Sequence, residues 1–220
     1  MRKIIWMAVL IGGLSTAYAQ SEKTKLPADI QPDSLNRLPV VKREEMTEEG
    51  KKAYDLNKRG AATVAPTGPA AILLQSPGAA EALRNLNDYL RRPNNILGDG
   101  LTELAILVAA REFDQQYVWS AHEPAALKAG ITQSTIDAVK FRKDAVGLGE
   151  KETVIIRMGR QLFREHKLDS DLFAKAVQLF GKQGTVEMVV IMGDYTLNAL
   201  LLDAVDQHLP ADRKPMLPGR

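Results

Sequence analysis

The chain contains no cysteine among its 220 residues. A protein without thiols cannot form disulfide cross-links and cannot use a disulfide relay for redox chemistry. Its stability must therefore come from a hydrophobic core. An apolar fraction of 45% over this length is enough to build one, and the length fits one mature domain.

The chain also lacks an excess of charge of either sign, with 29 Lys and Arg against 27 Asp and Glu. Arg2 and Lys3 are the only charged residues before Gln20, so a chain that begins at Gln20 is formally neutral. No segment interleaves basic with aromatic side chains. Because nucleic-acid binding needs a clustered positive surface, we expect no nucleic-acid partner.

The N-terminus has the layout of a secretory signal peptide at residues 1–19. Arg2 and Lys3 precede an apolar run from Ile4 to Leu14, and an A-x-A cleavage site ends at Ala19. The apolar run is shorter than the roughly 20 residues of a membrane span, which argues against an uncleaved anchor. We expect cleavage before Gln20 and a soluble protein, free of the membrane, in the periplasm or outside the cell.

Proline-rich sequence follows the signal and separates it from the helical part of the chain. Residues 20–43 contain Pro27, Pro32 and Pro39 among scattered charges, without a sustained apolar period. This composition predicts an extended N-terminal arm. We expect one folded domain at residues 44–210 and a C-terminal tail at residues 211–220.

The chain shows no convincing period-two pattern of a β-strand, whereas helical spacing of apolar residues recurs along it. The fold class predicted is therefore all-α, a bundle of about eight helices joined by short loops. The expected helices run from Thr47 to about Gly60 and over residues 78–89, 100–110, 114–129, 132–141, 152–165, 169–180 and 185–205.

Local signals sharpen these boundaries. Asp114 is a suitable N-cap for the 114–129 helix, and Gly130 is a suitable glycine to end it. Pro124 inside this helix removes the hydrogen bond to the carbonyl of Ser120 and predicts a kink.

The stretch from Val64 to Pro77 is apolar but punctuated by proline and glycine, which predicts a loop buried against the core or a ligand pocket.

Glu103 and His122 are the strongest candidates for catalysis. They lie nineteen positions apart on two consecutive predicted helices, where a carboxylate and an imidazole can face each other and transfer a proton. His122 lies on the apolar stripe of its helix and should point inward. The alternatives are a Glu103 that only interacts with its helix dipole and a His122 satisfied within the core.

Four further polar or aromatic residues are candidates for a substrate pocket: Tyr117, Trp119, Tyr195 and Asn198. Tyrosine and tryptophan also serve as packing groups with hydrogen-bonding tips, and this structural alternative remains open. We expect no metal site, because a catalytic zinc usually needs three protein ligands and the other histidines are distant in sequence.

These motifs together resemble the carboxymuconolactone decarboxylase family of the alkylhydroperoxidase D superfamily. The resemblance covers about Thr47 to Pro210. The peroxidase branch carries a Cys-x-x-Cys before the same histidine, where this chain has Gln115 and Val118. It therefore points to the decarboxylase-like branch. The motifs that carry it are L-T-E-L-A-I-L-V-A-A-R, Y-V-W-S-A-H-E-P-A-A-L-K-A-G and G-D-Y-T-L-N-A-L-L-L-D-A.

The resemblance implies an enzyme without a cofactor that assembles into homotrimers or hexamers, with Glu103 and His122 in its pocket. Such a decarboxylase acts on a small lactone whose carboxylate leaves as carbon dioxide. The resulting dienolate must be stabilised and reprotonated, and His122 or Glu103 could supply the proton.

Two other functions remain open at this stage. One is a non-catalytic small-molecule-binding or assembly protein that retains the pocket. The other is a peroxidase by family label, which the absence of cysteine disfavours. The export signal is a further departure, because the family's known decarboxylation belongs to intracellular aromatic catabolism. An exported relative should therefore act on a different substrate or have a changed role.

Overall fold

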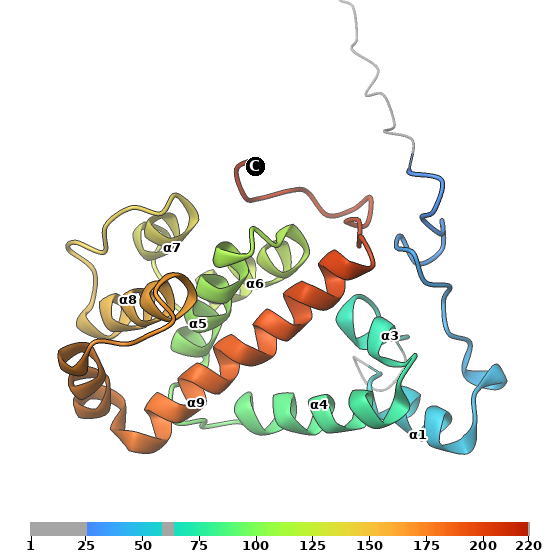
Figure 1. The fold of residues 1–220 in the computed structure, drawn as a ribbon, viewed down its shortest axis with the longest axis horizontal. Helices are drawn as coiled ribbons and strands as arrows, with labels where there is room; N and C mark the ends of the chain where they lie inside the picture. Colours follow the sequence, from blue (N-terminus) through green and yellow to red (C-terminus); the bar gives the residue numbers. More distant parts are fainter. Residues whose placement is uncertain (1–25, 59–63, 220) are drawn as a thin grey trace, which may run out of the picture.

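A computed structural model describes residues 26–58 and 64–219 of the chain. Within these ranges the structure contains eight α-helices, one short 3-10 helix and no β-strand (Figure 1). The all-α prediction is therefore confirmed. The predicted signal peptide lies outside the described residues.

The helices keep the order and nearly the positions that the apolar spacing predicts. Their bounds are Arg43–Glu45 (η1), Glu48–Leu56 (α1), Pro69–Leu73 (α3), Pro77–Leu90 (α4), Asp99–Glu112 (α5), Gln116–Lys128 (α6), Gln133–Lys140 (α7), Glu150–Arg164 (α8) and Ser170–Ala204 (α9).

Helix α5 is the centre of the fold. Every side chain from Thr102 to Arg111 is buried, because this helix is apolar on all sides. It packs against α6, α7, α8 and α9. Glu103 is a carboxylate placed within this core helix, only 4% exposed, so its charge requires specific partners.

Helix α9 extends across one face of the molecule and packs on α5, α6 and α8 (Figure 1). Its backbone is interrupted at Gly181, where φ is 69° and ψ is 173°. Glycine adopts this conformation without a Cβ clash, and the break falls between the two successive helices that were expected here. Among the described residues α9 alone is long and apolar enough to cross a membrane, and 50% of its apolar window is buried inside the fold.

Two local predictions were wrong. The stretch from Val64 to Pro77 is not all loop, because Pro69–Leu73 forms α3; Pro69 occupies the first turn, where its missing N–H costs nothing. Asp114 does not cap α6. Its φ of 51° places it in the turn before the helix, and Gln115 is the N-cap, accepting a hydrogen bond from the N–H of Tyr117.

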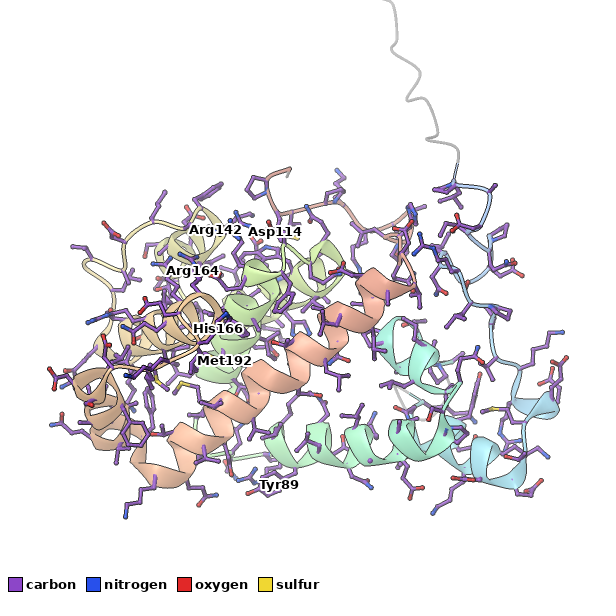
Figure 2. The ribbon with its side chains drawn as sticks, in the orientation of Figure 1. Tyr89, Asp114, Arg142, Arg164, His166 and Met192 are labelled. Carbon is purple, nitrogen blue, oxygen red and sulfur yellow. The ribbon has the colours of Figure 1, made fainter. Side chains whose placement is uncertain are left out.

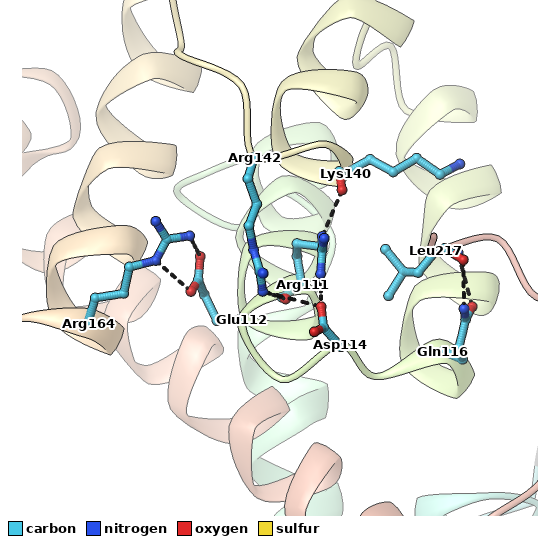
Figure 3. A network of polar contacts seen from close by, with 8 residues as sticks. All are labelled: Arg111, Glu112, Asp114, Gln116, Lys140, Arg142, Arg164 and Leu217. Atoms are coloured by element: carbon cyan, nitrogen blue, oxygen red, sulfur yellow. Dashed lines mark hydrogen bonds and ion pairs between the residues drawn. The ribbon is translucent and has the colours of Figure 1, made fainter. Parts of the chain in front are cut away.

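The turn between α5 and α6 is held by a network of polar contacts (Figure 3). Arg111 forms an ion pair with Asp114 and donates from Nε to the carbonyl of Lys140 at 2.7 Å. Arg142 donates to the carbonyl of Arg111 at 3.0 Å and to Asp114 at 3.2 Å. These bonds tie the end of α5 and the turn before α6 to the end of α7.

The same end of the molecule also anchors α8 and the C-terminal tail. Arg164 forms a bidentate ion pair with Glu112, at 2.6 and 2.9 Å. Gln116 donates to the carbonyl of Leu217 at 2.8 Å and accepts from its N–H at 3.0 Å. Figure 2 shows Asp114, Arg142 and Arg164 close together, far from Tyr89 beside α4.

Candidate functional site

Glu103 and His122 meet in the structure. Glu103 comes from the second turn of α5 and His122 from the middle of α6, and Nδ1 of the histidine lies 2.6 Å from Oε2 of the glutamate. A carboxylate oxygen only accepts, so Nδ1 of His122 donates to Glu103. This bond fixes the orientation of the imidazole ring.

Arg91 completes this pair, although no sequence signal pointed to it. It is the C-cap of α4, and its Nη2 donates to Oε1 of Glu103 at 2.6 Å. Its Nη1 donates to the hydroxyl of Tyr195 at 2.9 Å. One guanidinium therefore joins α4, α5 and α9 around the carboxylate.

These contacts set the ionisation of the group. Burial raises the pKa of Glu103, but the bonds and charges of His122 and Arg91 outweigh it and leave the pKa below its ordinary value. Burial lowers the pKa of Arg91, which its interactions with Tyr195 and Glu103 more than reverse. Burial also raises the pKa of Tyr195. At neutral pH the site therefore contains an ionised carboxylate, a guanidinium and a neutral phenol.

A cavity of about 160 Å³ opens beside the histidine. His122 lines it, whereas Glu103 lies behind the histidine and does not. The ring of Tyr195 stands edge-on to the imidazole, with the centroids 4.9 Å apart and the planes at 86°. Further polar residues that line the cavity are Asn57, Thr67, Arg84, Asn87, Tyr117, Asp194, Asn198 and Arg213.

The four predicted pocket residues separate into two groups. Tyr117, Tyr195 and Asn198 line the cavity. Trp119 lies elsewhere: it is fully buried, and its indole N–H donates to Glu123. Glu123 is also held by Lys140 at 3.0 Å. Trp119 is therefore a core residue whose indole N–H has a hydrogen-bond partner.

Tyr117 forms a wall of the cavity with support on both sides. A Cβ added to Gly68 would lie 2.5 Å from the Tyr117 ring, so only glycine allows the chain to approach the ring this closely. Arg213, from the C-terminal tail, stacks with its guanidinium carbon 4.7 Å from the ring centroid. The tail thereby contributes a cation to a cavity built mainly by α3, α4, α6 and α9.

The charges around the cavity favour an anion. Arg84 is paired with Asp88 at 2.8 Å. Arg213 has no carboxylate within ion-pair distance in the described part of the chain. A cation of this kind can receive a carboxylate of a ligand. In the same described ranges no group of three His, Asp or Glu side chains is placed to hold a metal ion.

No protein-family model matches the chain, and no curated protein matches it. Solved structures do. The alkylhydroperoxidase AhpD core protein from Ralstonia eutropha JMP134, an uncharacterized peroxidase-related protein, superposes with a TM-score of 0.64 over 81% of this chain and 94% of its own. This chain has the AhpD-like fold. The debrominase Bmp8 without ligand has the same fold, with a TM-score of 0.56 over 80% of this chain and 92% of its own.

Each of the two proteins is 14% identical to this chain, so the likeness shows the AhpD-like fold and no more. The fold-level recognition made from the motifs around Glu103 and His122 is thereby confirmed. The two printed descriptions differ, one peroxidase-related and one a debrominase. An AhpD-like fold thus hosts different reactions, and the function of this chain has to be argued from its own side chains.

Proposed function

We propose that this protein is an exported lyase without a cofactor, which performs acid-base chemistry on a small carboxylated or lactone substrate. The observation that carries the proposal is the arrangement of His122, whose Nδ1 is held by Glu103 while its ring lines the cavity. This is the geometry of a general base oriented by a carboxylate.

The carboxylate has a defined role in this arrangement. Because its pKa is below the ordinary value, Glu103 stays ionised and stabilises the imidazolium that forms when His122 takes a proton. Arg91 in turn prevents Glu103 from taking that proton itself, since it occupies the other carboxylate oxygen at 2.6 Å. The proton therefore remains on the imidazole, at the cavity wall.

The chemistry begins with a carbon acid or a carboxylate beside an unsaturated lactone. Removal of a proton by His122, or departure of carbon dioxide, leaves an electron pair that delocalises into a dienolate. The neutral phenol of Tyr195 and the amide of Asn198 line the same cavity and are suited to bind an oxyanion. Protonation of the carbon then gives the product.

The test is turnover by the purified protein of two probes. The first is α-angelica lactone, a β,γ-unsaturated lactone whose isomerisation proceeds through a dienolate. The second is a lactone that bears a carboxylate and can release carbon dioxide. Isomerisation or carbon dioxide release supports the lyase. Affinity for both probes without turnover of either supports the alternative, a small-molecule-binding protein.

A peroxidase remains the least favoured function. One structural neighbour is described as peroxidase-related, but that description belongs to the neighbour. This chain has no cysteine, so the thiol relay has no residues to work with. Peroxide consumption with a dithiol donor is therefore expected to equal the rate without protein.

Arg213 is expected to receive the carboxylate of the ligand. In the Arg213→Gln variant we expect the affinity for 2-furoate to fall by about 10-fold or more, since a charge-assisted bond contributes about 1.5–3 kcal/mol. Affinity for methyl 2-furoate should stay unchanged because the ester carries no charge. Calorimetric titration measures both.

Arg84→Gln is the control for this change, because Arg84 lines the same cavity but is already paired with Asp88. Its effect on 2-furoate binding should be the smaller of the two. Equal losses for the acid and the ester in Arg213→Gln would show that the residue acts through the position of Tyr117 and not through its charge.

We also propose that the protein self-associates through α9. Its outer side carries an apolar stripe in which Val186 is 61% exposed, Leu197 36% and Leu200 54%. With Val190 and Gly193, these residues follow the alternating four- and three-residue spacing of a helix seam. This spacing favours α9 of a second copy of the protein as the partner. The space around Gly193 is open, so the partner helix can approach there.

The double variant Leu197→Glu/Leu200→Glu is expected to be monomeric at concentrations where the wild-type protein is an oligomer. Placing charges on both copies of the seam costs more than the contact contributes. Light scattering coupled to size-exclusion chromatography measures the mass. Val146→Glu, at a side chain that is 83% exposed outside the stripe, is the control and should leave the mass unchanged.

A further inference from the structure

Helix α9 buries two carboxyl groups that have opposite surroundings. Glu187 and Asp194 lie seven residues apart on the helix, and each is 6% exposed. A buried carboxyl group either has charged partners or gives up its charge by holding a proton. Glu187 and Asp194 differ in which of these two conditions applies to them.

Glu187 is fully partnered. It accepts hydrogen bonds from Tyr89 at 2.7 Å, Arg92 at 3.1 Å and Gln183 at 2.8 Å. Burial raises the pKa of Glu187, but these partners outweigh it and hold the pKa below its ordinary value. Glu187 does not line the cavity that contains His122. It is a structural ion that ties α9 to the end of α4.

Asp194 has almost none of this support. One amide, Asn87 Nδ2, donates to its Oδ2 at 3.3 Å. Across residues 26–58 and 64–219 no other hydrogen bond and no ion pair reaches it. Burial raises the pKa of Asp194, and Asn87 and the charge of Arg91 reverse this only in part. Asp194 lines the cavity together with His122.

We propose that Asp194 is the proton donor of this cavity, and that it returns a proton to the carbanion that forms there. The inference rests on the proposed acid-base function. The Oδ–H bond of Asp194 breaks as the new C–H bond of the product forms, and the electron pair of the carbanion enters that C–H bond. The carboxylate that results is reprotonated from water, and His122 releases to water the proton that it removed from the substrate, so both groups return to their starting states.

The other ionisable groups near the cavity are less suited than Asp194 to donate a proton. Glu103 is ionised, and Arg91 and His122 engage both of its oxygens. Tyr195 is a weak acid whose pKa burial raises further. The cavity contains two more charged groups, Arg84 and Arg213, and arginine does not release a proton at physiological pH. His122 as base and Asp194 as acid thus form the pair, with environments that separate their tasks.

The experiment follows α-angelica lactone in D₂O with the full mature chain. In Asp194→Asn we expect isomerisation to fall by about 100-fold, because the amide keeps the shape of the carboxyl group but has no acidic proton. Deuterium exchange at the carbon next to the carbonyl should continue at the wild-type rate, since His122 removes and returns the proton at that carbon, whereas Asp194 protonates the far carbon of the dienolate. Glu187→Gln, the matched control, should change neither rate.

Wild-type isomerisation by Asp194→Asn would overturn the inference. Equal loss of exchange and isomerisation would also overturn it, because the residue would then only position the base. Failure of the proposed function looks different: the wild-type protein then catalyses neither process, and His122→Ala behaves as the wild type does.

Stability against pH decides the matter without any substrate. Between the ordinary pKa of 3.8 and its raised folded value, Asp194 holds a proton that the unfolded chain has lost, so the wild-type protein loses stability as pH rises through this window. Asp194→Asn removes this loss and should be the more stable protein at pH 7. Glu187→Gln should be less stable than wild type at pH 7, with the deficit shrinking in acid. A destabilised Asp194→Asn at pH 7 would show a structural ion and overturn the inference.

Discussion

We expect the His122→Ala variant to lose a factor of about 10² to 10⁴ in turnover of α-angelica lactone, the range that a positioned general base contributes. The imidazole lines the cavity, and its Nδ1 is held by an ionised carboxylate at 2.6 Å. Alanine removes the proton acceptor, and Glu103 cannot take its place from behind the wall.

The fold should survive this change. The carboxylate keeps Arg91, which donates to Glu103 at 2.6 Å and to Tyr195 at 2.9 Å, so no unpaired charge is left behind. The side chain of His122 is itself 17% exposed, which limits the cavity that alanine leaves. Circular dichroism and the thermal midpoint should therefore stay close to wild type while the rate falls.

His166→Asn is the control for loss of a histidine. His166 lies in the exposed turn after α8 and does not line the cavity, and its φ of 56° is one that asparagine tolerates. Its turnover should equal the wild-type value. Unchanged turnover in His122→Ala would remove the basis for an acid-base enzyme and leave the binding protein as the explanation of the cavity.

The largest expected loss of stability belongs to Trp119→Ala, at about 3–5 kcal/mol in the free energy of unfolding. The indole is fully buried, and its N–H donates to Glu123. Alanine leaves a large void and deprives a buried carboxylate of one of its two partners, Lys140 being the other. Urea unfolding followed by circular dichroism measures the change.

Trp119→Phe separates the two contributions. It keeps most of the apolar volume and removes only the hydrogen bond, so we expect a smaller loss of about 1–3 kcal/mol. Affinity for 2-furoate should be unchanged in the folded Phe variant, because Trp119 does not line the cavity. A loss of affinity at wild-type stability would instead assign the indole to the ligand site.

The pairing of Glu103 with His122 was predictable because it depends on two local properties. His122 lies on the apolar stripe of its helix, which directs it inward, and Glu103 lies near the start of a helix that is buried on all sides, joined to the first by a short turn. The end of α6 was predictable for the same reason, since Gly130 adopts a φ of 92° directly after it. The break in α9 fell at a glycine between two expected helices.

The positions of Arg91 and Trp119 could not be predicted from local sequence patterns. The sequence around Arg91 is that of a solvated helix end, and its role depends on where α4 lies relative to α5 and α9. The side of α6 that faces the cavity also depends on which neighbours cover the remaining sides. Trp119 was expected in the pocket, but Glu123 and Lys140 offered its N–H a buried partner elsewhere.

The amino-acid sequence by itself determined the all-α class, the order of the helices, the absence of thiol chemistry and the pairing of one carboxylate with one imidazole. These properties follow from composition and from periods of a few residues. Only the tertiary structure decided that Arg91 and Tyr195 join the pair, that Arg213 reaches the cavity, and that Asp194 is buried without an ion pair to any other described residue. Each of these depends on contacts between segments distant in the chain, and burial and charge pairing exist only once those segments are packed together.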